Sequence, residues 1–176
     1  MKYFFDTEFI EDGKTIDLIS IGIVSEDDRE YYALNLECDW GKASKWVKEN
    51  VIEHLPLKPP LRWVAGGRID SSHAKSVGWR FKDSIATEII EFCSPQSYGE
   101  PEFWAYYADY DWVVFCQLFG TMMELPKGFP MYCRDVKQLC DEKGNPQLPK
   151  QESVEHHALN DARWTKQAYL WLRNQE

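Results

Sequence analysis

Two carboxylates near the N-terminus have a spacing that could bind a metal ion. The stretch Phe4-Phe5-Asp6-Thr7-Glu8-Phe9 places Asp6 and Glu8 two residues apart at the end of an apolar strand. Residues i and i+2 of a strand point to the same face, so both carboxylates would approach one point. Like charges that close repel, and neither acid has a cationic neighbour in sequence. The pair indicates either a solvated strand end or part of a site for a divalent cation.

Two further aspartates lie at the start of apolar helical stripes. Asp111 precedes Val114, Phe115 and Leu118 at helical spacing, and Asp161 has the same place in the last predicted helix. A buried carboxylate is costly unless something compensates its charge. For either aspartate the alternative is an N-cap or a salt bridge in the first turn. Taken together, however, four acids from three elements favour Mg²⁺ or Mn²⁺: Asp6, Glu8, Asp111 and Asp161.

Three segments resemble the exonuclease motifs of the DEDDh 3′–5′ exonucleases. They are Asp6-x-Glu8, Tyr110-Asp111 after a strand, and His156-x-Ala158-Leu159-x-Asp161-Ala162. The residues around 3–36, with Phe5-Asp6-Thr7-Glu8-Phe9-Ile10-Glu11-Asp12-Gly13, and Cys116-Gln117-Leu118-Phe119-Gly120 are similar to the RNase AS branch, which is directed to polyadenylate. The resemblance covers both ends and the middle of the chain and fails over about residues 56–101.

This resemblance implies an α/β fold of the RNase H-like type. Three antiparallel strands would be followed by parallel strands in one mixed sheet, with helices on its faces. The implied activity is hydrolysis of single-stranded RNA from its 3′ end, with a preference for adenylate-rich ends and release of nucleoside 5′-monophosphates. Asp6, Glu8, Asp111 and Asp161 would hold two divalent ions, Mg²⁺ or Mn²⁺. Members of the RNase AS branch are homodimers, which implies a homodimer here.

Two neighbouring histidines compete for the role of general base. His157 lies four residues before Asp161 and would share its face if the helix had already begun. The spacing of the family motif selects His156 instead, on the loop before the helix, where an imidazole could accept the proton of an attacking water. His157 is then expected to be a surface histidine, and His54 and His73 to be incidental.

Several residues beside the acids are candidates for contacts with the substrate. Phe9 follows the acidic pair directly, and Tyr107, Tyr110 and Trp112 flank the motif that contains Asp111. Aromatic rings at these places can stack on bases, although rings in such numbers also fill cores. We predict that Phe9, Tyr110, Trp112 and Thr7 contact the substrate.

The composition is that of one globular domain over residues 1–176. Of the 176 residues, 44% are hydrophobic and 28% charged, and the net charge of −9 argues against a protein that coats nucleic acid. The five cysteines form no Cys-x-x-Cys pair, which favours a reducing, cytoplasmic location. No apolar stretch has the length of a membrane span, and no signal peptide is recognisable, so no membrane association is expected.

Hydrophobic periodicity predicts the order of the elements. A basic stretch at about 56–80 has no clear period, which indicates an irregular insertion that either is solvated or contacts phosphates. Strands are predicted at 2–6, 16–24, 31–36, 102–107 and 131–133, and helices at 44–55, 82–93, 110–119, 136–143 and 157–173.

Two other functions remain open at this point. One is a single-strand DNA 3′–5′ exonuclease, which the same acids and histidine would serve equally well. The other is a module that holds a nucleic-acid 3′ end without cutting it, although such a module has no need of a proton acceptor.

Overall fold

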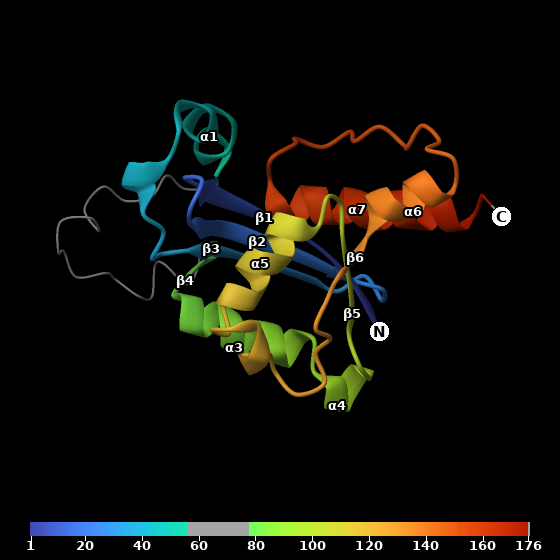
Figure 1. Cartoon of the computed structure of the whole chain (residues 1–176), viewed down its shortest axis with the longest axis horizontal. Coiled ribbons are helices and arrows are strands. Elements are labelled where there is room, and N and C mark those ends of the chain that lie inside the picture. Colours follow the sequence, from blue (N-terminus) through green and yellow to red (C-terminus); the bar gives the residue numbers. More distant parts are fainter. Residues whose placement is uncertain (56–77, 176) are drawn as a thin grey trace.

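The computed structural model describes residues 1–55 and 78–175, which are built around one mixed sheet (Figure 1). Its six strands lie in the order β4-β3-β2-β1-β5-β6. Antiparallel pairing joins β1 to β2 and β2 to β3, while β5 and β6 continue the sheet in parallel. The strands are β1 Lys2–Glu11, β2 Ile16–Ser25, β3 Glu30–Asn35, β4 Trp79–Arg80, β5 Glu102–Ala105 and β6 Arg134–Asp135. The predicted α/β, RNase H-like architecture is confirmed.

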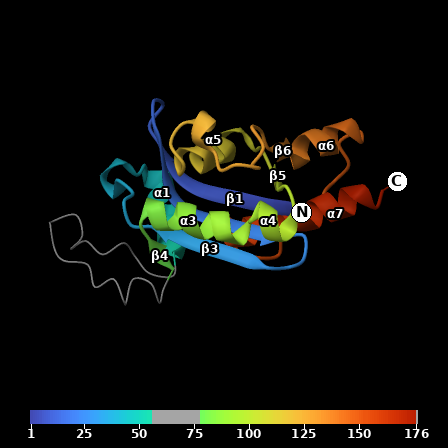
Figure 2. The ribbon, with the colours of Figure 1, turned by 90° about the horizontal axis from the view of Figure 1, so that it is seen from below.

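Helices cover both faces of this sheet (Figures 1 and 2). One face carries α3 (Lys82–Phe92) and α5 (Asp109–Gln117), and the other carries α6 (Val136–Glu142) and α7 (Ala158–Arg173). Because the central strands are buried on both faces, their sequences are almost continuously apolar. Tyr3 and Phe5 of β1 belong to the cluster beneath α3 and α5, whereas Phe4 belongs to the cluster with α6 and α7.

The last helix has the apolar stripe that its sequence predicts. Its buried residues recur at helical spacing and pack against β1 and β2. They are Ala158, Ala162, Thr165, Ala168, Tyr169 and Leu172. The helix begins one residue later than predicted and ends at the predicted residue, so Asp161 lies in its first turn.

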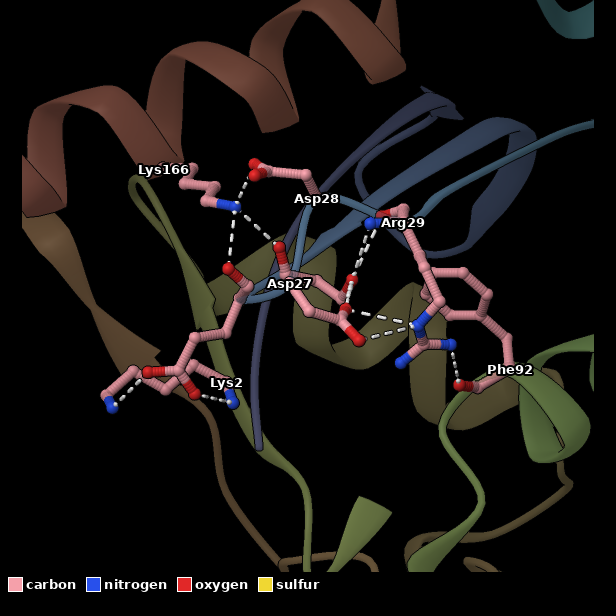
Figure 3. Close-up of polar contacts among 8 residues, drawn as sticks. Lys2, Asp27, Asp28, Arg29, Phe92 and Lys166 are labelled. Carbon is pink, nitrogen blue, oxygen red and sulfur yellow. Dashed lines mark hydrogen bonds and ion pairs between the residues drawn. The ribbon is translucent and has the colours of Figure 1, made fainter. Parts of the chain in front are cut away.

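Polar contacts fix this helix to the turn between β2 and β3 (Figure 3). Lys166 reaches from α7 to the backbone carbonyl of Ser25 at 2.7 Å and to the carboxylate of Asp28 at 2.6 Å. In the same turn, the Arg29 guanidinium donates to Asp27 and to the carbonyl of Phe92 at the end of α3. The turn therefore holds helices from both faces of the sheet.

Two predicted elements differ in kind from the observed ones. The helix expected over 44–55 is divided into α1 (Lys45–Asn50) and a 3₁₀ helix, η2 (Ile52–His54). Val51 and Leu55 are buried, whereas Trp46 is 53% exposed and contacts His156 of the site described below. The prediction of a strand at 131–133 was wrong, because pairing with β5 begins only at Arg134.

The remaining differences concern lengths of elements and the basic stretch. β1 continues to Glu11, so the acidic pair lies within the strand and not at its end. Residues 79–80 of the expected irregular insertion form β4, parallel to β3, and two residues are too few to show a period. Residues 56–77 lie outside the described part. The described residues also form three short helices: η1 (Trp40–Lys42), α4 (Pro95–Tyr98) and η3 (Met122–Glu124).

Candidate active site

The acidic pair lies where β1 extends beyond its parallel neighbour. β5 pairs with β1 only over Lys2–Phe4, after which the chain turns away into α5. Asp6 and Glu8 follow on one face of β1, opposite Gly22 and Ser20 of β2. A crevice outside the carboxyl ends of neighbouring strands is the usual place for a ligand in an open α/β sheet. This topology therefore opens one side of the acidic pair to a substrate.

A glycine opposite Asp6 brings the last helix onto the sheet. A Cβ at Gly22 would lie 2.4 Å from the backbone of Leu159 and 2.5 Å from that of Ala158, which no real packing tolerates. Glycine inside a strand often marks such a close backbone approach. The first turn of α7 consequently lies against the strand pair that carries Asp6, and Asp161 comes within reach of the two acids.

Asp161 is oriented by residues on the preceding loop. Its Oδ1 accepts a hydrogen bond from the Gln151 side-chain amide at 2.5 Å, and its Oδ2 accepts one from the backbone N–H of His157 at 3.1 Å. The second contact resembles a capping box, in which an early helical side chain satisfies the N-cap amide. Both carboxylate oxygens of Asp161 therefore have a fixed position.

Asp111 is fixed from the other side of β1. It lies in the first turn of α5, is 6% exposed, and accepts hydrogen bonds at Oδ1 from the Thr7 backbone N–H and hydroxyl. The two distances are 2.9 Å and 2.5 Å. Thr7, which we predicted to contact substrate, thus holds Asp111 in this structure; a contact with substrate stays a prediction.

The four acids form one electrostatic group. Burial, followed by the charges of Asp111, Glu8 and Asp161, raises the pKa of Asp6 well above its usual value. Burial first, and then the charge of Asp161, raises the pKa of Glu8 to about 9. Burial likewise raises the pKa of Asp111 to about 7 and that of Asp161 above its usual value. Without a compensating cation, these side chains cannot all be ionised at neutral pH.

Three of these acids could hold a cation together. One carboxylate oxygen from each of Asp6, Glu8 and Asp161 lies within 4.8 Å of the other two. Mg²⁺ binds oxygen ligands at about 2.1 Å, so small side-chain rotations would bring all three oxygens onto one ion. Asp111 lies in the same hollow and is near enough to shift the pKa of Asp6. The chemistry of this donor set fits a hard divalent cation.

The two histidines before α7 point to different surroundings. His156 has a φ of +60°, and its side chain lines the same hollow as the acids and makes a T-shaped contact with Trp46, 4.9 Å between ring centroids. His157 stacks on Tyr32 at 4.8 Å, and burial lowers its pKa. The expectation that His157 is a surface histidine was wrong, because the N-cap position turns its ring onto β3.

Two adjoining hollows meet at the acids. Asp6, Tyr106, His156 and Asp161 line both of them. The smaller hollow, about 320 Å³, also has Thr7, Glu8, Phe9, Trp46, Val51, Tyr107, Tyr110 and Asp111 in its walls. The larger one, about 700 Å³, extends beneath the loop between α6 and α7. Lys150 is the one lysine or arginine among the described residues that line either hollow.

The predicted aromatic contacts fall in two places. Phe9 and Tyr110 stack on each other with centroids 6.0 Å apart and planes 12° apart, and both line the smaller hollow. Trp112 instead packs against Phe5 and Phe115 in the core, and it does not line that hollow. Phe9 and Tyr110 therefore lie beside the acids, whereas Trp112 lies in the core.

Sequence reasoning missed four residues that shape this site. Gly22 had a usable signal, a single glycine inside an apolar strand. Tyr106 directly follows a predicted strand, but several neighbouring aromatics carry the same signal. Trp46 and Gln151 had none, since Trp46 lies 110 residues from His156 in the chain and Gln151 lies ten residues from Asp161.

Comparison with known proteins identifies the class to which this fold and site belong. Residues 1–172 match the model of the 3′–5′ exoribonuclease Rv2179c-like domain. The chain belongs to this family of 3′–5′ exoribonucleases.

Two named relatives agree with this assignment. The chain is 41% identical to the 3′–5′ exoribonuclease Rv2179c of Mycobacterium tuberculosis strain H37Rv, over 163 residues that cover 93% of this chain and 88% of the relative. The 3′–5′ exoribonuclease MT2234.1 of M. tuberculosis strain CDC 1551 matches with the same identity and coverage. Among solved structures, the complex of the yeast NOT1 MIF4G domain with CAF1 gives a TM-score of 0.46 at 10% identity, covering 99% of this chain and 79% of that chain.

Over the described residues, no helix combines the length and the apolar character needed to cross a bilayer.

Proposed function

We propose that this chain is a metal-dependent 3′–5′ exoribonuclease of the DEDDh type that releases nucleoside 5′-monophosphates from single-stranded RNA. The observation that carries the proposal is the convergence of Asp6, Glu8 and Asp161 within 4.8 Å, with Asp111 and His156 in the walls of the same hollow. Membership of an exoribonuclease family supplies the class of substrate.

The four acids are suited to hold two divalent cations, Mg²⁺ or Mn²⁺. Asp6 would be shared between them, with Glu8 and Asp161 completing one site and Asp111 serving the other. When bound, such a pair of cations stabilises the attacking and leaving oxygens of an in-line displacement at phosphorus. Their positive charge would also allow the buried carboxylates, whose pKa values burial raises, to be ionised at neutral pH.

The remaining side chains have roles around the scissile phosphate. His156 accepts the proton of the attacking water, and Trp46 braces its imidazole from the side. The phosphorus–O3′ bond breaks, the upstream nucleotide leaves with a 3′-hydroxyl, and the terminal nucleotide leaves as its 5′-monophosphate. The stacked pair Phe9 and Tyr110 contacts the terminal nucleotide, because it faces the acids from the end of β1 and the start of α5.

The resemblance to RNase AS supports two finer proposals. One is a preference for adenylate-rich 3′ ends, and the other is a homodimer that acts in the cytoplasm. The adenylate preference and the homodimer rest on the sequence similarity around Phe5–Gly13 and Cys116–Gly120, whereas the cytoplasmic location rests on the five cysteines without a Cys-x-x-Cys pair.

A single assay separates the proposal from its alternatives. A 5′-labelled oligoadenylate of RNA and its DNA counterpart are incubated with the protein in Mg²⁺ or in EDTA, with Asp6→Asn as the control. We expect a ladder of RNA products shortened from the 3′ end in Mg²⁺ alone. Cleavage that survives EDTA or Asp6→Asn would contradict the metal mechanism. Preferential shortening of DNA would favour the DNA exonuclease, and binding without any shortening would favour the non-catalytic module.

A further inference from the structure

The turn between β5 and α5 holds an aromatic residue in a strained conformation beside the acids. Tyr107 has a φ of +57°, in the left-handed region that residues other than glycine seldom adopt. Such backbone strain persists only where the surrounding structure enforces it, and it concentrates at functional sites. The Tyr107 ring is 62% exposed and lines the smaller hollow together with Asp6 and Asp111.

One carboxylate enforces this conformation. Asp135, at the end of β6, accepts hydrogen bonds from the backbone N–H groups of Tyr107 at 3.2 Å and Ala108 at 3.3 Å. The same side chain caps α6 by accepting from the backbone N–H of Lys137 at 2.6 Å. Asp135 also pairs with Ala105 in the sheet, so its own position is fixed by the strand ladder. The turn is thereby attached to the rigid part of the fold.

Neighbouring rings brace Tyr107 further. Its ring meets the edge of Tyr106 at 4.6 Å between centroids, and Tyr106 in turn meets the edge of Trp164 on α7 at 4.9 Å. The core has no need of a side chain that is 62% exposed. Packing therefore does not explain why an aromatic residue occupies a position where glycine would carry no strain.

We propose that Tyr107 stacks on a base of the RNA near its 3′ end, and that Asp135 is a positioning residue that holds Tyr107 against the hollow. The proposal rests on the proposed function and adds a specific base contact to it. A pre-positioned ring binds a base without the entropic cost of ordering an exposed side chain. The contact would be made through the face of the ring, which every base can satisfy, and not through the tyrosine hydroxyl.

Substitutions at Tyr107 test the contact. Stacking of one base on an aromatic side chain changes affinity by about tenfold or more when the ring is removed. We expect Tyr107→Ala to raise KM for oligoadenylate about tenfold with kcat nearly unchanged, and Tyr107→Phe to retain the wild-type KM. Tyr107→Gly should raise KM as Tyr107→Ala does while raising Tm above that of Tyr107→Ala, because glycine relieves the strain.

Substitutions at Asp135 test the positioning. Asp135→Ser keeps a hydroxyl that can cap α6, but its single short side-chain oxygen cannot also serve both amides of the turn. We expect Asp135→Ser to keep a Tm near that of the wild type and to raise KM severalfold. In a protein that already carries Tyr107→Ala, adding Asp135→Ser should cause no further change in KM, because Asp135 acts through the Tyr107 ring. An equal rise in KM in both backgrounds would overturn the positioning role.

A binding measurement separates this inference from the proposed function. Fluorescence anisotropy of 5′-fluorescein oligoadenylate is recorded with the Asp6→Asn protein, with and without Tyr107→Ala. A tenfold loss of affinity supports the stacking contact even if the wild-type protein proves to have no exonuclease activity. Affinities and KM values within twofold of each other, or no binding by either protein, would overturn the inference.

Discussion

Two groups of carboxylates, one at the β2–β3 turn and one around the first turn of α7, have their negative charges compensated in opposite ways. Around the β2–β3 turn, each acid forms an ion pair with a lysine or arginine. Figure 3 shows the pairs of Asp27 and Asp28. The pairs are Glu26 with Lys2, Asp27 with Arg29, Asp28 with Lys166, and Glu30 with Arg163. Around the first turn of α7, the described part of the chain shows no ion pair between Asp6, Glu8, Asp111 or Asp161 and a lysine or arginine.

The pKa values follow this difference. Hydrogen bonds from Lys2, Ser25 and Arg163 are the first causes that lower the pKa of Glu26, Asp27 and Glu30, respectively. At the other group, burial raises the pKa of all four acids. The turn acids therefore have their compensating charges in the chain, whereas the buried group requires protons or cations from solution. A structural role fits the first group, and binding of a cation fits the second.

The largest effect is expected from removing one acid of the buried group. Asp161→Asn should lower kcat/KM at least about a thousandfold, because several kcal/mol of metal-assisted stabilisation are lost. Asp27→Asn, at the turn, should leave kcat/KM unchanged. The measurement is the rate of oligoadenylate shortening in Mg²⁺, with circular dichroism to confirm that both variants fold. Equal losses in both variants would remove the distinction between the two groups.

The next effect concerns the glycine that lets α7 approach Asp6. Gly22→Ala places a methyl group 2.4 Å from the Leu159 backbone, so the first turn of α7 must move away. A displacement of about 1 Å can cost about 100-fold in rate, and we expect a loss of this order. Gly41→Ala, whose nearest neighbour is an Asp39 oxygen at 3.3 Å, is the matched control and should retain activity. Full activity in Gly22→Ala would show that the position of Asp161 is not critical.

A third prediction uses the pKa of Glu8, which burial and nearby negative charges raise from an ordinary value of 4.5 to about 9. Between these values the folded state binds a proton that the unfolded state has lost. The contribution of Glu8 to stability is therefore complete below pH 4.5 and falls as pH rises toward 9. In EDTA, the difference in Tm between Glu8→Gln and the wild type should grow in favour of the variant from pH 5 to pH 8. Each kcal/mol corresponds to roughly 2–4 °C.

Addition of Mg²⁺ should reverse this difference, because the cation favours the ionised carboxylate of the wild type. A difference in Tm that stays constant with pH would contradict the raised pKa of Glu8.

The smallest effects are expected at the turn. Lys166→Met removes hydrogen bonds from a largely buried ammonium group to the Ser25 carbonyl and the Asp28 carboxylate and should cost about 1–3 kcal/mol of unfolding free energy. Arg163→Gln breaks a more exposed pair with Glu30 and should cost less than about 1 kcal/mol. Urea denaturation measures both. A large loss of kcat in either variant, beyond its loss of stability, would argue that the turn has a catalytic role.

Much of the fold could be predicted from the sequence because its strongest elements are periodic or continuously apolar. The strand around Ile21 and the last helix were predicted to within one residue of their observed bounds, and the start of the first strand was predicted correctly, although that strand continues five residues further. The two-residue strand β4 and the division between α1 and η2 carry no period, and only contacts with distant segments define them. Boundaries that depend on tertiary pairing escaped prediction for this reason.

The residues of the candidate site show the same division between those that a local sequence pattern predicts and those that only distant contacts define. The acids Asp6, Glu8, Asp111 and Asp161 were predicted from spacing and from the resemblance to a nuclease family, and the structure gathers them around one hollow. Trp46, Gln151 and the hydrogen bond from Thr7 to Asp111 could not be predicted, because each joins residues that no short motif spans. Sequence patterns can therefore indicate the groups that carry out the chemistry, but they seldom indicate the residues that orient those groups.

The account depends most directly on whether the buried acids bind a cation. Electron paramagnetic resonance of Mn²⁺ titrated into the metal-free protein measures free and bound ions without any substrate. We predict at least one Mn²⁺ bound per chain in the wild type and in Asp27→Asn, with binding lost in Asp161→Asn and weakened in Glu8→Gln. Equal Mn²⁺ binding by the wild type and Asp161→Asn would contradict the central claim.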